Sequence, residues 1–316
     1  MSPAGTAARL SILIFHRVLA RPDPLFPGEV DASRFDAICG WLRRWHNVLD
    51  LHDAVQRLSI GQLPARALAI TFDDGYADNY SLALPILQRH GLKATFFIAT
   101  GFLNGGRMWN DTVTEAIRRT RHARLDLSEI GLPGVTAFDL HDWPARRRAI
   151  ETVLPLVKYS PLGERLAVVE RIAALADAKL PNDLMMSSEQ VRALHDGGMG
   201  IGGHTVHHPI LAAMDDAAAR AEMLEGRQWL ESLTQANVPM LAYPNGHPGH
   251  DYSGKTVGLA RELGFVGAVS TAPGAAVTGS DVYQLPRFTP WDTQRWRFGL
   301  RLAKNLRVPV KVVQWA

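Results

Sequence analysis

The sequence holds a single cysteine, Cys39, among 316 residues. One thiol cannot form a disulfide within the chain, so a framework held together by disulfides is excluded. The sequence also has no apolar run long enough to span a membrane, because residues 10–15 have only the length of a strand. The first nine residues lack the basic segment and long apolar stretch of a signal peptide. These absences favour a cytoplasmic protein.

The sequence also lacks a large excess of positive or negative charge. Lys and Arg number 34 against 31 Asp and Glu, and the net charge is only +3. This excess is too small to predict a nucleic-acid partner, and the arginines are scattered over helical stretches as solvated faces. A basic patch for an anionic polysaccharide, or for peripheral association with a membrane surface, is the less favoured alternative. The 47% hydrophobic content is that of a globular protein with a sizeable core.

Short apolar runs alternate with helical patterns along most of the chain. Because no hairpin signal separates them, the alternation predicts parallel strands in an α/β fold, and about seven strands suit a barrel whose chemistry gathers at the strand carboxyl ends. The expected strands are residues 10–15, 67–70, 94–99, 198–203, 238–243, 265–269 and 283–288.

The pattern changes between about residues 104 and 186. Three helices are expected there, at 109–121, 143–157 and 163–178, and no run is convincing as a strand. Because strand-like runs resume afterwards, we interpret 104–186 as a helical insertion within one catalytic domain that spans residues 1–316.

Two adjacent carboxylates, Asp73 and Asp74, follow the apolar strand at 67–70. Each disfavours the ionisation of the other, so such a pair usually persists because a cation lies beside one of them, or because one is a base of raised pKa. Gly75 permits a sharp turn that leaves both carboxylates exposed at the rim. A plain polar turn after a strand is the structural alternative.

Three histidines lie within five residues beside the glycine-rich strand at 198–203. His204 and His208 are four residues apart, a separation that can bring two imidazoles to one metal ion, and Pro209 favours a turn over a helix here. Two His nitrogens and one carboxylate oxygen make a three-ligand site with an open position for water. One aspartate of the pair would be the third ligand, and the other would take the proton of a metal-activated water that attacks a carbonyl.

Residues 71–76 (Thr-Phe-Asp-Asp-Gly-Tyr) and 204–209 (His-Thr-Val-His-His-Pro) together resemble the polysaccharide deacetylase, or NodB-homology, family of carbohydrate esterases (family 4). Both motifs come in the family's order, and the resemblance covers nearly the whole chain except the insertion. It implies a distorted (β/α) barrel of seven strands and metal-dependent hydrolysis of an N-acetyl group on an amino sugar. By the same resemblance Asp73 is the catalytic base, and the metal ligands are Asp74, His204 and His208.

A third motif matches more loosely. Residues 241–246 (Leu-Ala-Tyr-Pro-Asn-Gly) look like the form found in the branch that acts on poly-N-acetylglucosamine, which implies substrate or oxyanion contacts at Tyr243 and Asn245. A backbone N–H near Asn245 could stabilise a tetrahedral oxyanion. A plain turn is the alternative, and the family's groove-lining arginine is missing, because residues 238–240 are Val-Pro-Met.

Two further catalytic residues follow from the resemblance. Arg287, after Leu285 and Pro286, is similar to the arginine that pairs with the base aspartate, although a strand-end arginine can equally bind a surface carboxylate. The family's late Leu-x-His motif is absent. His16 resembles the rearranged version in which the general acid comes first and protonates the leaving amine. A strand-end histidine bonded to a neighbour is the structural reading.

The resemblance therefore implies a hydrolase that removes N-acetyl groups from an amino-sugar glycan, or from a lipid-linked or nucleotide-linked precursor. The expected cofactor is a divalent metal, Zn²⁺ first, with Co²⁺ or Ni²⁺ as alternatives. An O-acetyl esterase or another linear amidase would use the same metal site. A non-catalytic glycan-binding module is the remaining alternative, and the intact acid pair argues against it, because such a module needs no free base.

Overall fold

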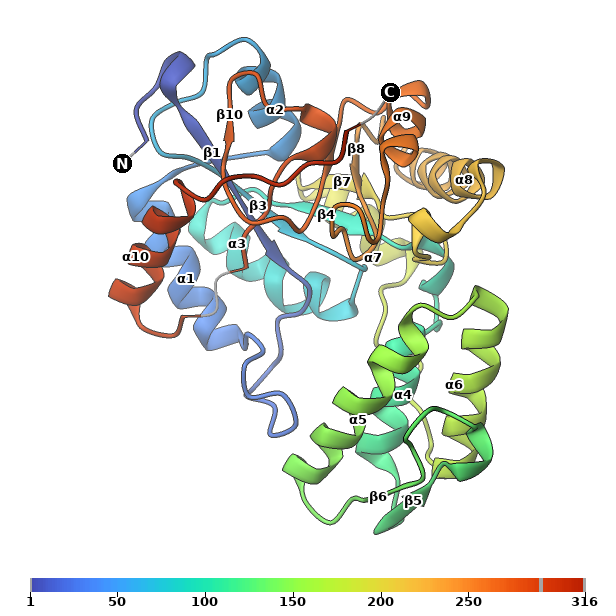
Figure 1. The fold of residues 1–316 in the computed structure, drawn as a ribbon. Helices are drawn as coiled ribbons and strands as arrows, with labels where there is room; N and C mark the ends of the chain where they lie inside the picture. The colour runs from blue at the N-terminus through green and yellow to red at the C-terminus, as the bar shows by residue number, and fades with distance from the viewer. Residues whose placement is uncertain (1, 290–291, 315–316) are drawn as a thin grey trace. The chain divides into compact units, whose positions relative to one another are not determined.

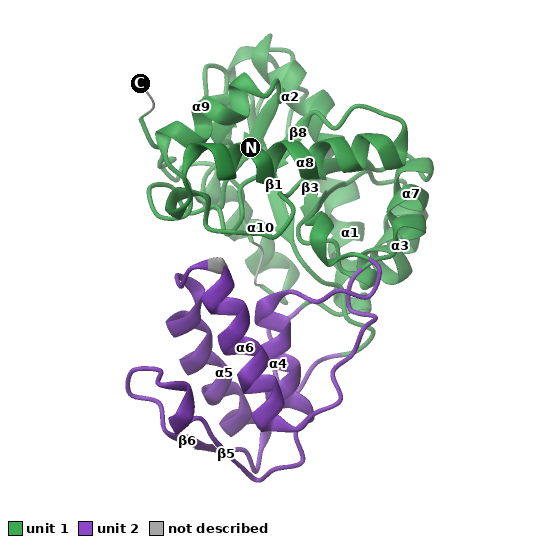
Figure 2. Ribbon diagram, turned by 90° about the vertical axis from the view of Figure 1, so that its right-hand side faces the viewer, with its two compact units in different colours: residues 1–21, 30–103, 186–316 green, residues 22–29, 104–185 purple. Residues whose placement is uncertain are grey.

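The computed structural model describes residues 2–289 and 292–314. Contacts within the chain divide it into two compact units, drawn in different colours in Figure 2. The first unit comprises Met1–Arg21, Val30–Leu103 and Met186–Ala316, and the second comprises Pro22–Glu29 and Asn104–Met185. The interpretation of 1–316 as one catalytic domain with an insertion at 104–186 stays a prediction.

A curled, mostly parallel sheet forms the centre of the first unit (Figure 1). Its strands follow the order β10-β1-β3-β4-β7-β8-β9, with β2 paired to β3 off this path, and β10 runs antiparallel to β1. Of these, β2 and β10 were not expected from the sequence. The bounds are β1 Arg9–Phe15, β2 Asn47–Leu49, β3 Ala67–Phe72, β4 Thr95–Ile98, β7 Gly200–Gly203, β8 Met240–Ala242, β9 Gly267–Val269 and β10 Ala276–Val277.

The segment at 285–288 connects β9, at one end of this path, with β1, which lies next to its other end. Leu285 forms a parallel bridge with Val269 of β9, and Phe288 forms one with Leu13 of β1. The predicted strand at 283–288 is therefore wrong as a regular strand, because Val282–Gln284 is a 3₁₀ helix and Pro286 has no N–H to donate. The segment nevertheless closes the sheet into the distorted barrel that the sequence predicts.

Nearly all positions of β1, β3, β4 and β8 are buried, which explains their largely apolar sequences. In β1, Ile12 packs in one apolar cluster with Phe97, whereas Leu13 and Phe15 belong to another with Phe72. Helices surround the sheet, and Asp or Ser side chains cap the amino ends of five of them. Their bounds are α1 Ala32–Trp45, α2 Leu51–Ser59, α3 Leu84–His90, α7 Ser188–Asp196, α8 Asp216–Thr234, α9 Gly254–Glu262 and α10 Arg295–Asn305.

The second unit has its own apolar core between three helices, α4 Trp109–Arg119, α5 Trp143–Lys158 and α6 Leu162–Ala176. The expectation that this region has no strand is wrong, because β5 Arg124–Asp126 and β6 Ala137–Asp139 form an antiparallel pair. Three residues per strand are too few for a recognisable alternation. Arg118 binds Asp23 with two hydrogen bonds of 2.9 and 2.6 Å, which ties residues 22–29 to α4.

In the part of the chain that the structure describes, every helix is too short or too polar to cross a membrane.

Candidate metal centre

The two adjacent aspartates lie where β3 ends. The Asp73 N–H donates to the Phe15 carbonyl at 2.9 Å, and the chain then turns sharply at Asp74 and Gly75, with φ angles of 76° and 92°. Both carboxylates are buried, with Asp73 2% and Asp74 6% exposed, so the expectation of exposed acids at the rim is wrong. A positive φ at a non-glycine residue costs on the order of 1–3 kcal/mol, and such strain concentrates at functional positions.

Asp74 faces two imidazoles at the end of β7. Its Oδ1 atom lies 3.3 Å from His204 Nε2 and 3.6 Å from His208 Nε2. One ligand atom from each of the three residues lies within 4.8 Å of the others, and all three residues are buried. Asp74, His204 and His208, the ligand set implied by the family resemblance, are thus brought together from two parallel strands that are not consecutive in the chain.

The hydrogen bonds around this cluster fit a divalent cation. His204 Nδ1 donates to the Ala242 carbonyl at 2.8 Å, and this arrangement leaves Nε2 with its lone pair toward Asp74. Asp74 Oδ1, which faces both imidazoles, is buried and has no hydrogen-bond partner among the described residues. A carboxylate oxygen and two imidazole nitrogens are the donor set that Zn²⁺ and similar divalent ions take.

The electrostatics of the cluster favour the ligating states of Asp74 and His208. Burial raises the pKa of Asp74, but the neighbouring His204, His16 and His208 outweigh it and hold that pKa well below its usual value. Burial, with the charge of His204, lowers the pKa of His208 to about 3. Burial lowers the pKa of His204, but the carboxylates of Asp73 and Asp74 reverse this and raise it. An ionised Asp74 and a neutral His208 are therefore ready to bind a cation.

Asp73 has a different partner. Both of its oxygens accept from Arg287, at 2.6 Å from Nη1 and 2.7 Å from Nη2, and Arg287 Nε donates to the Ser270 carbonyl at 2.9 Å. Burial raises the pKa of Asp73, but the positive charges of Arg287 and His204 bring it below the usual value. Arg287 reaches this position because residues 285–288 close the barrel beside β1. The two adjacent carboxylates can both be ionised because each lies beside its own positively charged or metal-binding groups: Arg287 beside Asp73, and the two histidines beside Asp74.

His16 lies at the end of β1 with an exposed side chain. It is close enough to Asp73 and Asp74 that its charge contributes to lowering the pKa of both. Its carbonyl accepts from Asn79 Nδ2 at 2.8 Å, whereas its ring has no hydrogen bond within residues 2–289 and 292–314. The structural interpretation of a ring bonded to a neighbour thus has no support, and the role of His16 as general acid stays a prediction.

The third motif follows β8. Tyr243 is fully buried, its hydroxyl donates to the Tyr283 carbonyl at 3.0 Å, and its N–H donates to the Val269 carbonyl at 3.2 Å. Tyr243 therefore serves packing in this structure, since neither donor is available to a substrate. Asn245 is half-buried with a φ of 58°, and among the described residues its N–H has no acceptor.

The sequence did not reveal Glu222, which holds the loop that carries both histidines. Glu222, on α8, accepts from the N–H groups of Val206 and His207 at 2.9 and 2.8 Å, and from His207 Nδ1 at 2.8 Å. Four residues along the same helix, Gly226 lies against Thr205, and a Cβ there would stand 2.9 Å from the Thr205 oxygen. Gly226 was the one feature of the sequence that could have indicated this contact, because a glycine inside a helix can mark a place where another segment packs closely.

Replacing Gly226 with alanine is expected to lower Zn²⁺ affinity about 10- to 100-fold, because the added methyl group displaces the loop between His204 and His208. Competition with a chromophoric chelator measures this affinity. Gly258→Ala is the matched control, since Gly258 lies inside α9 with no atom within 4 Å of its added Cβ. Equal affinities of the two variants would show that the loop does not depend on α8.

Comparison with known proteins agrees with this geometry. The barrel and its site define a NodB-type carbohydrate esterase fold. The model of the family described as polysaccharide deacetylase matches residues 61–127 and 161–268, more than half of the chain. The chain therefore belongs to the polysaccharide deacetylase family and is a hydrolase of that class, as the motifs at 71–76 and 204–209 predict.

Individual relatives are distant. YxkH of Bacillus subtilis (strain 168), a protein named as a polysaccharide deacetylase, is 21% identical over 282 residues, which cover 89% of this chain and 71% of YxkH. IcaB from Ammonifex degensii is similar in structure, with a TM-score of 0.61, 17% identity and coverage of 97% of this chain and 100% of IcaB. The Streptococcus pyogenes deacetylase PplD, solved with acetate, has a TM-score of 0.58 and 20% identity, covering 89% and 92% of the two chains. These structures support the fold.

Proposed function

We propose that this protein is a metal-dependent N-deacetylase of an amino-sugar glycan or a glycan precursor. One observation carries the proposal: two adjacent buried carboxylates have separate partners. Asp74 faces His204 and His208, whereas Asp73 is held by Arg287. The position of Asp74 is that of a metal ligand. The contact with Arg287 keeps Asp73 ionised beside the three ligands, where the reaction needs a base.

In the proposed mechanism Asp74, His204 and His208 would hold a divalent ion, and that ion would act as a Lewis acid toward the acetyl carbonyl and lower the pKa of water. Asp73 accepts the proton of the attacking water, and Arg287 fixes the orientation of that carboxylate. The Asn245 N–H donates to the developing oxyanion. His16 gives a proton to the departing amine, which completes the hydrolysis.

The test is acetate release by the purified protein from N-acetylglucosamine oligomers and poly-N-acetylglucosamine, with Zn²⁺, Co²⁺ or Ni²⁺ restored. O-acetylated sugars run in parallel, and faster release from the N-acetylated glycans is expected. The Tyr-Pro-Asn-Gly motif makes poly-N-acetylglucosamine the first polymer to test. No acetate from any N-acetylated glycan, with metal verifiably bound, would refute the proposal.

The proposed role of His16 predicts a dependence on the leaving group. His16→Ala is expected to slow hydrolysis of an N-acetyl group by about 10²–10⁴-fold, because an amine must be protonated as it leaves. The same variant should cleave an aryl acetate ester nearly as fast as the wild type, since a phenolate leaves without a proton. His52→Ala, on α2, is the control. An equal loss on both substrates would reassign the proton donor.

The expectation of a cytoplasmic protein also stays a prediction, and fractionation of cells that carry the tagged native protein tests it.

A further inference from the structure

One segment near the carboxyl end of this chain is rich in basic residues and has no acidic ones. Residues 295–313 contain six Lys and Arg and no Asp or Glu. Because the whole chain has 34 basic and 31 acidic residues, the remainder has 28 against 31. The net positive charge thus comes entirely from this segment. Its exposed basic residues are Arg295, Arg297, Arg301, Lys304, Arg307 and Lys311, of which Arg301 is paired with Asp292.

Large apolar side chains are exposed among these cations. Trp296 is 66% and Leu300 48% exposed, and because they are four residues apart they lie on one face of α10. Val308 and Val312, which follow the helix, are 37% and 52% exposed. Exposed Trp and Leu beside a dense set of Lys and Arg is the composition of helices that lie in the interface of a bilayer. Recognition of RNA needs the cations but gains nothing from the aliphatic side chains.

This face is held rigidly by the first unit. Phe298, buried on the opposite side of α10, packs edge-on against Trp41 with ring centroids 5.4 Å apart. Asn305 exchanges two hydrogen bonds with the backbone of Gly274, at 3.0 and 2.7 Å. Arg9 at the start of β1 donates to the Leu306 carbonyl at 2.8 Å. The backbone that carries these cations is therefore held in place by the first unit.

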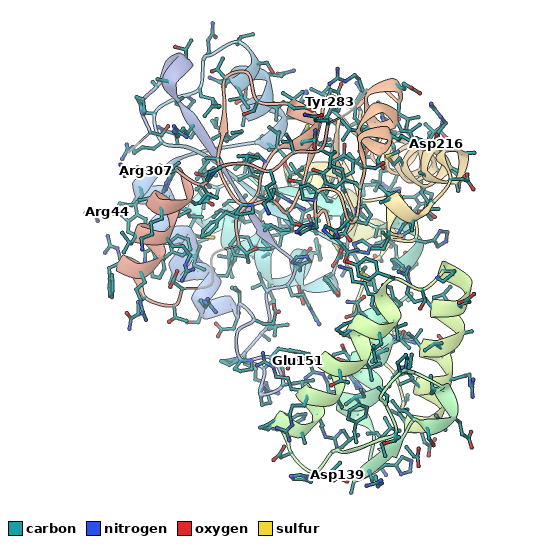
Figure 3. All side chains as sticks on the ribbon, in the orientation of Figure 1. Arg44, Asp139, Glu151, Asp216, Tyr283 and Arg307 are labelled. Atoms are coloured by element: carbon teal, nitrogen blue, oxygen red, sulfur yellow. The ribbon has the colours of Figure 1, made fainter. Side chains whose placement is uncertain are left out.

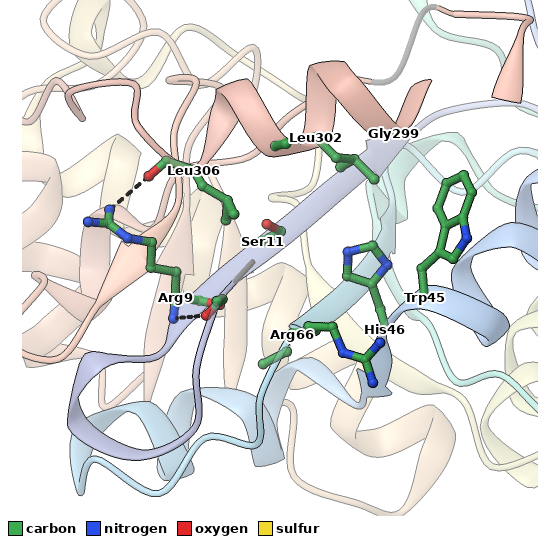
Figure 4. Close-up of a pocket in the computed structure, with 11 residues that line it drawn as sticks. Arg9, Ser11, Trp45, His46, Arg66, Gly299, Leu302 and Leu306 are labelled. Atoms are coloured by element: carbon green, nitrogen blue, oxygen red, sulfur yellow. Dashed lines mark hydrogen bonds between the residues drawn. The ribbon is translucent and has the colours of Figure 1, made fainter. Parts of the chain in front are cut away.

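A cavity of about 280 Å³ continues the same surface beneath α10 (Figure 4). Leu302 and Leu306 of the α10 segment form one side, and Arg9 and Arg66 contribute positive charge at the starts of β1 and β3. None of the lining residues is acidic. His46 faces this space between Trp45 and Ser11, and its Nδ1 atom is buried without a partner in the described chain. The cavity combines apolar walls with cations, as an anionic amphiphile requires.

The basic surface extends beyond the helix. Figure 3 shows Arg44, on α1, and Arg307 at the α10 edge of the first unit. The cavity opens near the amino ends of β1 and β3, whereas Asp73 and Asp74 follow the carboxyl end of β3. A ligand at this surface would thus leave the metal centre accessible.

We propose that α10, residues 306–313 and the cavity beneath them bind an anionic phospholipid surface. Trp296 and Leu300 enter the headgroup region, the surrounding Lys and Arg pair with lipid phosphates, and the cavity receives one lipid headgroup beside Arg9 and Arg66. The proposed lipid binding does not depend on the hydrolytic reaction. A negative result in the vesicle assay would therefore leave the proposed deacetylase activity untouched, and a negative result in the acetate assay would leave the lipid binding untouched.

The experiment is co-sedimentation of the full chain with vesicles of phosphatidylcholine, or of phosphatidylcholine and phosphatidylglycerol in equal parts. Binding to the anionic vesicles alone is expected, and it should weaken as salt is raised. Arg297→Glu with Lys304→Glu should lower partitioning at least about 100-fold, since each cation contributes about 1 kcal/mol near an anionic surface. Arg121→Glu with Arg148→Glu, exposed arginines of the second unit, is the matched charge control and should bind normally.

Trp296→Ser with Leu300→Ser separates insertion from charge, and because both side chains are exposed this variant should keep its fold by circular dichroism. It should lose most of the vesicle binding at high salt. Wild-type binding by the Arg297 and Lys304 variant would overturn the proposal, as would no binding to anionic vesicles. Binding to single-stranded RNA in preference to the vesicles would assign the basic face to nucleic acid and overturn it equally.

Discussion

Replacing Asp73 with asparagine is expected to lower kcat for acetate release by about 10²–10⁴-fold, because the amide cannot accept the proton of the attacking water. Metal affinity should change little, since the ligand oxygen belongs to Asp74. Acetate release and metal content, measured on the same preparation, check both parts. A variant that keeps wild-type turnover would remove Asp73 from the role of base.

A stability control is needed, because Asp73→Asn leaves the buried charge of Arg287 without its partner. Removing one partner of a buried ion pair costs about 3–5 kcal/mol of folding free energy. Asp73→Asn combined with Arg287→Met removes both charges and should recover much of that stability in urea unfolding. The double variant should remain as inactive as the single one. Recovered activity in the double variant would show that the single variant had failed through its fold.

The second large effect is expected from the ligands. Asp74→Ala and His204→Ala should each abolish stoichiometric binding of Zn²⁺ and reduce acetate release to background, because two remaining ligands do not make a catalytic site. His207→Ala is the control from the same loop, since its ring is 52% exposed and bonded to Glu222 instead of facing Asp74. Metal content by elemental analysis distinguishes the three. Full metal content in Asp74→Ala would contradict the proposed ligand set.

The parts of the site that lie in continuous sequence could be predicted. An apolar run followed by Asp73 and Asp74 identified a strand and the acids at its end, and His204 and His208 followed a second strand. Parallel strands bring their carboxyl ends to one edge, so two motifs far apart in sequence were expected to meet. The burial of both acids could not be predicted, because it depends on side chains from several elements.

Features that depend on tertiary packing could not be derived from local sequence patterns. The pairing of Arg287 with Asp73 was expected only from the family resemblance, because the single bridges at Leu285 and Phe288 that close the barrel leave no periodic pattern in the sequence. The contact of Glu222 with the loop depends on how α8 packs. The donors of Tyr243 are engaged by Tyr283 and Val269, which no local pattern indicates.

The most direct test of the account is a titration of the metal-free wild-type protein with Zn²⁺, with acetate release from N-acetylglucosamine oligomers measured at each occupancy. We expect no acetate release without metal, and release that rises in proportion to the metal occupancy and stops rising at one ion per chain. Full release by the metal-free protein, or none at full occupancy, would contradict it.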